Sequence, residues 1–414
     1  GYEAWLNAQM ALPNPSLMQL VVASDNEEFV LRGNKPLWTG NDPNFAGESY
    51  GVNRDGLGYV TTINTTANGT FNNNHPFHNN RRREQWTLAL QAKAQVRQRM
   101  AQALSEIVVI SEMDTTVQSR HYGAANYWDM LAQNAFGKYR TILENVTYSP
   151  MMGIYLSHLR NRAQYDAGGV TIFPDENYAR EIMQLFSIGL VLRHPDGSLV
   201  LDASGLPIPT YDNDDIAELA RVMTGLCHGA RHRNNIVIQR FNGLAFSNSS
   251  PRVSPQIEIQ GGDGGTGGNG STFTNFNEGG GEGWYQAPWI YPMSVLGRTA
   301  TVTASARPWH DFGAKTLLSG KVGQTNIPGL TDTQLNALSA AQSHTRAAED
   351  LTLAHNMLAG DPSAATYNGH PNTPVNISRW LIQRFTTSNP SAGYLYRVSE
   401  VYRQTNGNLG AVLK

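Results

Sequence analysis

The chain has 414 residues, of which 40% are hydrophobic and 15% are charged, and its formal net charge at pH 7 is -2. This length can bury a core without disulfides or metal ions, and the single cysteine, Cys227, excludes an intrachain disulfide and a cysteine-based metal knuckle. The balanced charge gives no electrostatic footprint for nucleic acid, and no run of about 18 apolar residues could span a membrane.

The predicted elements are mainly helices. Helical spacing of apolar residues predicts a short helix at 3–11, one or two helices over 84–110, and further helices at 125–136, 139–148, 151–160 and 175–188. Residues 33–83 are rich in Asn, Gly, Thr and Pro and predict a loop. Turn signals around an apolar run predict a small β-hairpin at 193–211. A helix follows from Asp212 to Gly225, and others are expected at 333–358, 374–386 and 391–404.

Between these groups lies a Gly-rich insertion at about 229–300. Its segment 260–283 should be mobile unless a partner orders it, because glycine loses the most backbone entropy when it is fixed. The sequence therefore predicts one large, mainly α domain over residues 1–414, a multi-helix globular domain with a small β-hairpin and long Gly/Asn-rich loops.

The composition favours export. The charged fraction is below the typical ~25%, and the polar load falls on Asn, Thr, Ser, Gln and 40 glycines. A nearly cysteine-free chain is compatible with an extracellular or cell-surface location, where a lone thiol is a liability. The chain opens on Gly1-Tyr2-Glu3 without the basic region of a signal peptide, and it stops inside a predicted helix, so we expect both ends to be truncated or processed.

Six segments resemble one family, in the same order. They are GYEAWLNAQMALP (1–13), NAFGKYRTILENVTYSPMMGIYLSHLRN (134–161), PDENYAREIMQLFSIGL (174–190), PTYDNDDIAELARVMTG (209–225), HDFGAKTLLSG (310–320) and HPNTPVNISRWLIQRFTTSNPS (370–391). Through them the chain resembles the domain-of-unknown-function-1800 family along nearly its whole length. The resemblance implies a mostly α-helical exported protein, often encoded beside a sulfatase-like exported protein, and implies no established reaction. Many members have an aromatic-His-Asn-His stretch where this chain has Leu104-Ser105-Glu106-Ile107, so a site made of those histidines does not carry over.

Two charged clusters are candidate catalytic residues. Arg180 and Glu181 lie on a helix that is apolar on most sides, where a charge needs a partner. They fit a buried polar network, a catalytic or metal-binding carboxylate at Glu181, or a surface salt bridge. His310, Asp311 and Lys315 could supply a base, an orienting carboxylate and a cation, or could start a helix with Asp311 as its cap and Lys315 paired with an acid. We hypothesise that the two clusters meet, with Glu181 or Asp311 paired to Arg180 or Lys315.

A third cluster is rich in carboxylates. Asp212, Asp214 and Asp215 superficially resemble a calcium loop, but Ala217 and Met223 stand where such a loop has Gly and Glu. The alternative is the N-cap of the following helix. Calcium is thus the one cofactor that the sequence suggests.

Two functions remain open. The first is a non-enzymatic structural, binding or assembly component outside the cell, whose partners are other protein chains. The sulfatase-like exported protein is the partner implied by the resemblance. The second is an exported hydrolase-like enzyme with a site around His310, Asp311 and Glu181. The sequence favours the first, because it contains no complete catalytic motif and its long loops suit contact surfaces.

Overall fold

The computed structural model describes residues 1–21, 24, 49–54, 60–66, 76–118, 120–227, 289, 292–303 and 306–414. The described part is mainly α-helical and its sheets are two-stranded and antiparallel, which confirms the predicted fold class. The predicted insertion at about 229–300 lies largely outside the described residues, and its segment 260–283 lies wholly outside them.

The helices follow the predicted order. They are α1 (Tyr2–Ala11), α3 (Pro76–Gln91), α4 (Gln95–Ile107), α5 (Thr115–Gln118), α6 (His121–Gln133), α7 (Tyr139–Thr147), α8 (Pro150–Tyr155), α9 (Asn177–Gln184), α10 (Asn213–Val222), α14 (Asp332–Ala337), α15 (Ala340–Ala359), α16 (Asn372–Phe385), α17 (Ala392–Gln404) and α18 (Leu409–Leu413).

The strands pair as neighbours in the order of the described chain. They are β1 (Ser49–Arg54) with β2 (Val60–Thr66), β3 (Tyr165–Ala167) with β4 (Val170–Ile172), β5 (Leu226–Cys227) with β6 (Ser294–Val295), and β7 (Lys315–Leu317) with β8 (Thr325–Ile327).

Local capping explains two boundaries that the periodicity did not predict. The helix expected at 333–358 is divided into α14 and α15, because Ser339 accepts a hydrogen bond from Gln342 N and the Gln342 side chain accepts one from Ser339 N. This capping box starts a new helix. The helix expected at 151–160 ends at Tyr155, and Ser157 then takes a positive φ of 63°.

The loop predicted over 33–83 is wrong where the structure describes it. Residues 49–54 and 60–66 form the β1–β2 hairpin, and the helix α3 already starts at Pro76. Residues 60–66 are mostly Thr, Val and Ile, which favour strands, and proline is favoured at the first position of a helix. The high Asn and Gly content concealed both signals.

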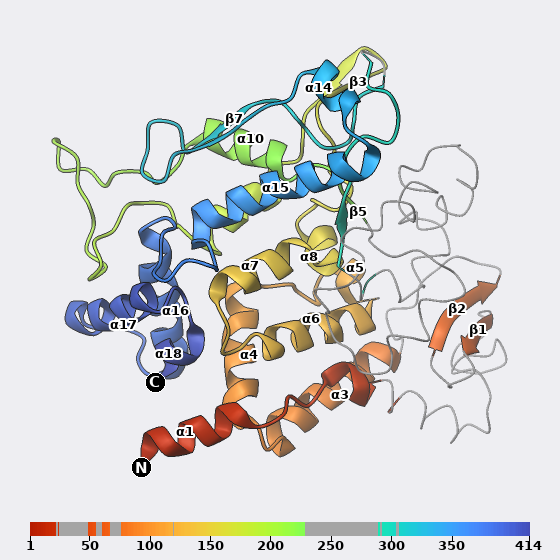
Figure 1. Ribbon diagram of the computed structural model, residues 1–414. Helices are drawn as coiled ribbons and strands as arrows, with labels where there is room; N and C mark the ends of the chain where they lie inside the picture. Colours follow the sequence, from red (N-terminus) through yellow and green to blue (C-terminus); the bar gives the residue numbers. More distant parts are fainter. Residues whose placement is uncertain are drawn as a thin grey trace.

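The described helices enclose one main core (Figure 1). It extends from Met100 on α4 to Leu409 on α18 and includes fully buried aromatic residues such as Tyr139 on α7. The long helix α15 packs on α7, and α4 packs on α6. The helices α16, α17 and α18 gather at one end, near both termini.

Among the described helices, none combines the length and the apolar character that crossing a membrane requires.

The residues predicted to form a β-hairpin at 193–211 instead form three short segments that pair with one another. Isolated antiparallel bridges join Val191 with Pro209, Arg193 with Leu199, and Leu201 with Pro207. The chain turns twice, at 194–198 and at 202–206, and the three segments bond to one another through backbone groups. We call residues 190–210 the arm. Figure 1 shows it projecting beyond the helices, between α9 and α10 in the chain.

One buried carboxylate fixes the N-terminal segment to the helices. Asp129, on α6, accepts a hydrogen bond from Ser16 Oγ at 2.6 Å and from the backbone N–H groups of Leu17 and Met18 at 2.7 and 3.0 Å. Burial raises the pKa of Asp129 to about 6, because desolvation outweighs these donors. The folded state therefore holds the proton of Asp129 more tightly than the unfolded chain does.

We predict that Asp129→Ala lowers the free energy of unfolding by roughly 1–3 kcal/mol, because buried backbone donors lose their acceptor. The stabilisation from a raised pKa is present below about pH 4 and is lost as the pH rises through about 6. The difference between wild type and variant, measured by urea denaturation, should therefore shrink between pH 4 and pH 7. Asp202→Ala, which removes an exposed acceptor of the Ser204 and Leu206 N–H groups, is the control. An equal difference at both pH values would contradict the prediction.

Candidate functional site

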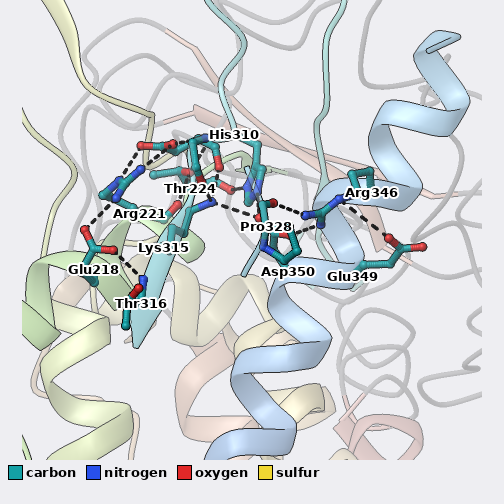
Figure 2. A network of polar contacts seen from close by, with 12 residues as sticks. Glu218, Arg221, Thr224, His310, Lys315, Thr316, Pro328, Arg346, Glu349 and Asp350 are labelled. Carbon is teal, nitrogen blue, oxygen red and sulfur yellow. Dashed lines mark hydrogen bonds and ion pairs between the residues drawn. The ribbon is translucent and has the colours of Figure 1, made fainter. Parts of the chain in front are cut away.

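A buried cluster of charges lies where the segment before β7 meets α15. Lys315 Nζ is 3.0 Å from Asp350 Oδ2, and His310 Nε2 is 3.2 Å from the same oxygen. All three side chains are almost completely buried, at 0%, 0% and 1% exposed for Lys315, His310 and Asp350. Arg346, one helical turn before Asp350 on α15, bonds to the other carboxylate oxygen. A single carboxylate thus holds three cationic or proton-bearing groups (Figure 2).

The imidazole of His310 is enclosed by partners on both sides. Its Nδ1 lies 2.9 Å from the carbonyl oxygen of Thr224, which can only accept a hydrogen bond, and its Nε2 faces the Asp350 carboxylate. Both ring nitrogens therefore have partners within the protein.

The electrostatics of the cluster centre on Asp350. Burial alone would raise the pKa of this carboxyl, but the hydrogen bond from His310 and the charge of Lys315 hold it at about 2. Burial lowers the pKa of Lys315, and Asp350 and Asp311 oppose that shift. The carboxylate therefore stays ionised across the physiological pH range and needs its partners at every pH.

Asp311 belongs to a second, more exposed layer of the same network. Arg221 on α10 donates to both of its carboxylate oxygens, at 2.8 and 3.2 Å, and also to Glu218 at 2.6 Å. Although burial raises the pKa of Asp311, the bond from Arg221 and the charge of Lys315 bring it below its ordinary value. The helix start that was one alternative for Asp311 is not formed, since the segment leads into strand β7. Lys315 does pair with an acid, Asp350, as predicted under that alternative.

Two glycines allow the network to close. Gly225 has a φ of +84°, and a Cβ there would lie 2.9 Å from His310 Cβ. A Cβ on Gly313 would lie 2.6 Å from Arg221 Nη2. At Gly225 the positive φ and the further contact with the Leu296 carbonyl oxygen exclude a side chain, so the segments 209–225 and 310–320 approach each other only because glycine stands there. At Gly313 the flexible end of Arg221 would have to move.

Arg180 and Glu181 do not join this network, and the hypothesis that the two clusters meet is wrong. Arg180 forms an exposed ion pair with Glu176, four residues earlier on the chain, at 3.6 Å. Glu181 is half-buried, and its Oε2 has no hydrogen-bond partner. Burial raises the pKa of Glu181, and Arg180 only partly opposes this. Of the alternatives predicted from the sequence, Arg180 forms the surface salt bridge, with Glu176 as its partner.

Asp212 and Asp215 form the N-cap of α10. Asp212 Oδ1 accepts from Asp214 N at 3.0 Å and from Asp215 N at 3.2 Å, while Asp215 accepts from Asp212 N, which completes a capping box. The ammonium of Lys321 lies between the two carboxylates, 2.7 and 2.9 Å away. Within the ranges that the structure describes, no group of three or more His, Cys, Asp or Glu side chains could hold a metal ion.

The network is completed by Asp350, Arg346 and Arg221, none of which was predicted from the sequence. A signal for Asp350 existed, because it interrupts an apolar stripe that includes Ala347, Leu351 and Ala354. A carboxylate on the buried face of a helix requires a cation from elsewhere. The sequence does not indicate which cation that is.

We predict that Asp350→Ala lowers the free energy of unfolding by about 3–5 kcal/mol, because it removes the carboxylate that pairs with the buried Lys315 ammonium and bonds to His310. The adjacent residue provides the control. Glu349 is 60% exposed, lies 4.0 Å from Arg346, and its replacement by alanine should stay within about 0.5 kcal/mol of wild type. Urea denaturation of both variants checks this expectation, and similar small losses would contradict it.

Substitution of Glu181 should have the opposite effect to substitution of Asp350: it should not destabilise the protein. Its raised pKa means that its contribution to stability is present at low pH and is lost as the pH rises through the folded-state pKa. Glu181→Gln removes the cost of the ionised form, so we expect its melting temperature at pH 7 to equal or exceed that of wild type. Glu176→Gln, which instead removes an exposed ion pair, is the matched control. A clear decrease in the melting temperature of Glu181→Gln would show that the carboxylate has a partner.

Comparison with known proteins gives a single match. The family model described as "Protein of unknown function (DUF1800)" covers residues 1–414. No curated protein and no solved structure matches the chain significantly.

Proposed function

This chain belongs to the DUF1800 family of proteins of unknown function, and we propose that it acts outside the cell as a non-enzymatic binding or assembly component. The proposal has its main support in the arm, which offers apolar side chains to another protein chain. Two further observations support it: the sealed state of the charged cluster, and a composition typical of exported proteins.

The arm combines a fixed backbone with exposed leucines. Leu190, Leu199, Leu201 and Leu206 are between 40% and 62% exposed. Backbone bonds hold the three segments together, with Leu192 N donating to Ile208 O at 2.8 Å and Val200 N donating to Leu192 O at 3.0 Å. Exposed apolar side chains that gather on one element are typical of protein interfaces, and these four leucines all lie within the arm.

The base of the arm is anchored in the core. The side chain of Asn372, fully buried on α16, accepts from Arg193 N at 3.0 Å and donates to the carbonyl groups of Ile188 and Val191 at 2.8 and 2.7 Å. These bonds fix the direction in which the arm leaves the helices. A pre-organised arm loses little conformational entropy when it binds a partner.

The hydrolase alternative has less support. It requires His310, Asp311 and Glu181 to act on one substrate, but His310 is sealed and Asp311 is held by Arg221. Glu181 bonds to neither of them in the described network. The contacts of His310 and Asp311 are those of a structural hydrogen-bond network, in which every polar group has a partner within the protein.

We predict that the double substitution Leu201→Ser and Leu206→Ser weakens association at least tenfold without lowering the melting temperature, because both side chains are exposed in the free protein. Sedimentation velocity would measure self-association, and titration calorimetry would measure binding to a sulfatase-like exported protein of the kind that the family resemblance implies as a partner. Leu90→Ser, which replaces an even more exposed leucine on α3, is the control. No association in either assay, or association that the arm variant leaves unchanged, would contradict the proposal.

A further inference from the structure

A groove lined by tryptophan and glutamine side chains runs between α3, α4 and α6. It consists of two adjoining hollows of about 220 and 120 Å³, which share Gln85, Gln102 and Trp128 as walls. Together they slightly exceed the roughly 300 Å³ at the lower end of ligand pockets. In Figure 1 these three helices lie on the other side of α7 from α10 and β7, so the groove is separate from the charged cluster.

Two indole rings line the larger hollow. Trp86 on α3 is 69% exposed, which is unusual for a side chain with so much apolar surface. Trp128 on α6 is half-buried, and its Nε1–H donates to Gln98 Oε1 at 3.1 Å, which fixes the ring. One ring is thus free to stack on a ligand and the other is held in place. Flat aromatic surfaces of this kind suit a partner that has an apolar face and polar edges.

The polar groups of the groove are mostly amides. The Gln85 side chain forms no hydrogen bond with any described residue, and the Gln102 side chain uses only its Nε2, which donates to Glu106 at 2.9 Å. A glutamine amide offers two donor hydrogens and two acceptor lone pairs. Sugar hydroxyls also donate and accept, so neighbouring hydroxyls on one ring match this arrangement, while the C–H face of the ring matches an indole.

The groove also carries an excess of positive charge. Arg81 and Arg82 both pair with the single carboxylate of Glu112, and Arg99 has no ion pair with a described residue. The lining therefore has more guanidinium groups than carboxylates. Guanidinium groups bind carboxylates through paired, charge-assisted hydrogen bonds.

We propose that this groove binds an oligosaccharide that contains uronic acid, with a sugar ring stacked on Trp86, hydroxyls bonded to Gln85 and Gln102, and a carboxylate held by Arg99. A single-stranded nucleic acid would also use aromatic rings and arginine, but it needs a positive track for successive phosphates. The groove offers one unpaired arginine and several amides, which favours the saccharide. This site does not depend on the arm, so its test is independent of the proposed function.

The test is calorimetric titration of the full chain with trigalacturonic acid and with maltotriose, a neutral trisaccharide. We expect the acidic trisaccharide to bind at least tenfold more tightly. Trp86→Ala should weaken the binding of both sugars at least tenfold, whereas Arg99→Gln should remove the preference for the acidic sugar and leave maltotriose unchanged. Trp5→Ala, which replaces an exposed tryptophan on α1 outside the groove, is the matched control and should bind like wild type.

Because Trp86 and Arg99 are exposed, both variants should keep the wild-type melting temperature, which each measurement would verify. Equal affinity for the two sugars would overturn the assignment of uronic acid. No binding of either sugar, or unchanged binding by Trp86→Ala, would overturn the saccharide site. Tighter binding of single-stranded RNA that is lost in Trp86→Ala would assign the groove to nucleic acid instead.

Discussion

The carboxylate of Asp350 is a charge that the protein must neutralise inside its own core. Desolvating an ion costs several kcal/mol, and only close cations and hydrogen bonds repay that cost. Lys315, His310 and Arg346 do so from three directions, and Arg346 also donates to the carbonyl of Pro328 at 2.6 Å. The segments before and after β7 and β8 are thereby held against α15, although they form little regular structure of their own.

Small residues allow the end of α10 to approach the segment that carries His310 and Asp311. Thr224 accepts from Asp311 N at 2.9 Å with its hydroxyl, and its carbonyl lies at His310, so the end of α10 touches both members of the His-Asp pair. Gly225 and Gly313 leave the room that this contact needs. A methyl group at Gly225 would push the end of α10 away from the segment that carries the charges, and one at Gly313 would displace the guanidinium of Arg221.

The sequence predicted the helices well because their signal is local. Periodicity located α6, α7, α16 and α17, and the acidic run at Asp212 was correctly interpreted as an N-cap alternative. The partners of charged residues were predicted poorly, because they depend on distant segments: Lys315 pairs across 35 residues with Asp350, and Arg221 across 90 with Asp311. Arg180 satisfied its charge locally with Glu176, and this short-range option made the expected long-range pairing unnecessary.

The segments that carry the family resemblance and the surfaces proposed to bind ligands are therefore mostly different parts of the molecule. The His-Asp motif and the Thr-Gly end of α10 are recognisable because buried charges demand particular residue types at particular distances. That demand concerns folding and places no requirement on a ligand. The groove between α3, α4 and α6 faces no such demand, because its lining is made of exposed and half-buried side chains such as Trp86 and Trp128. The buried network can therefore hold the fold while other residues determine what the proposed surfaces bind.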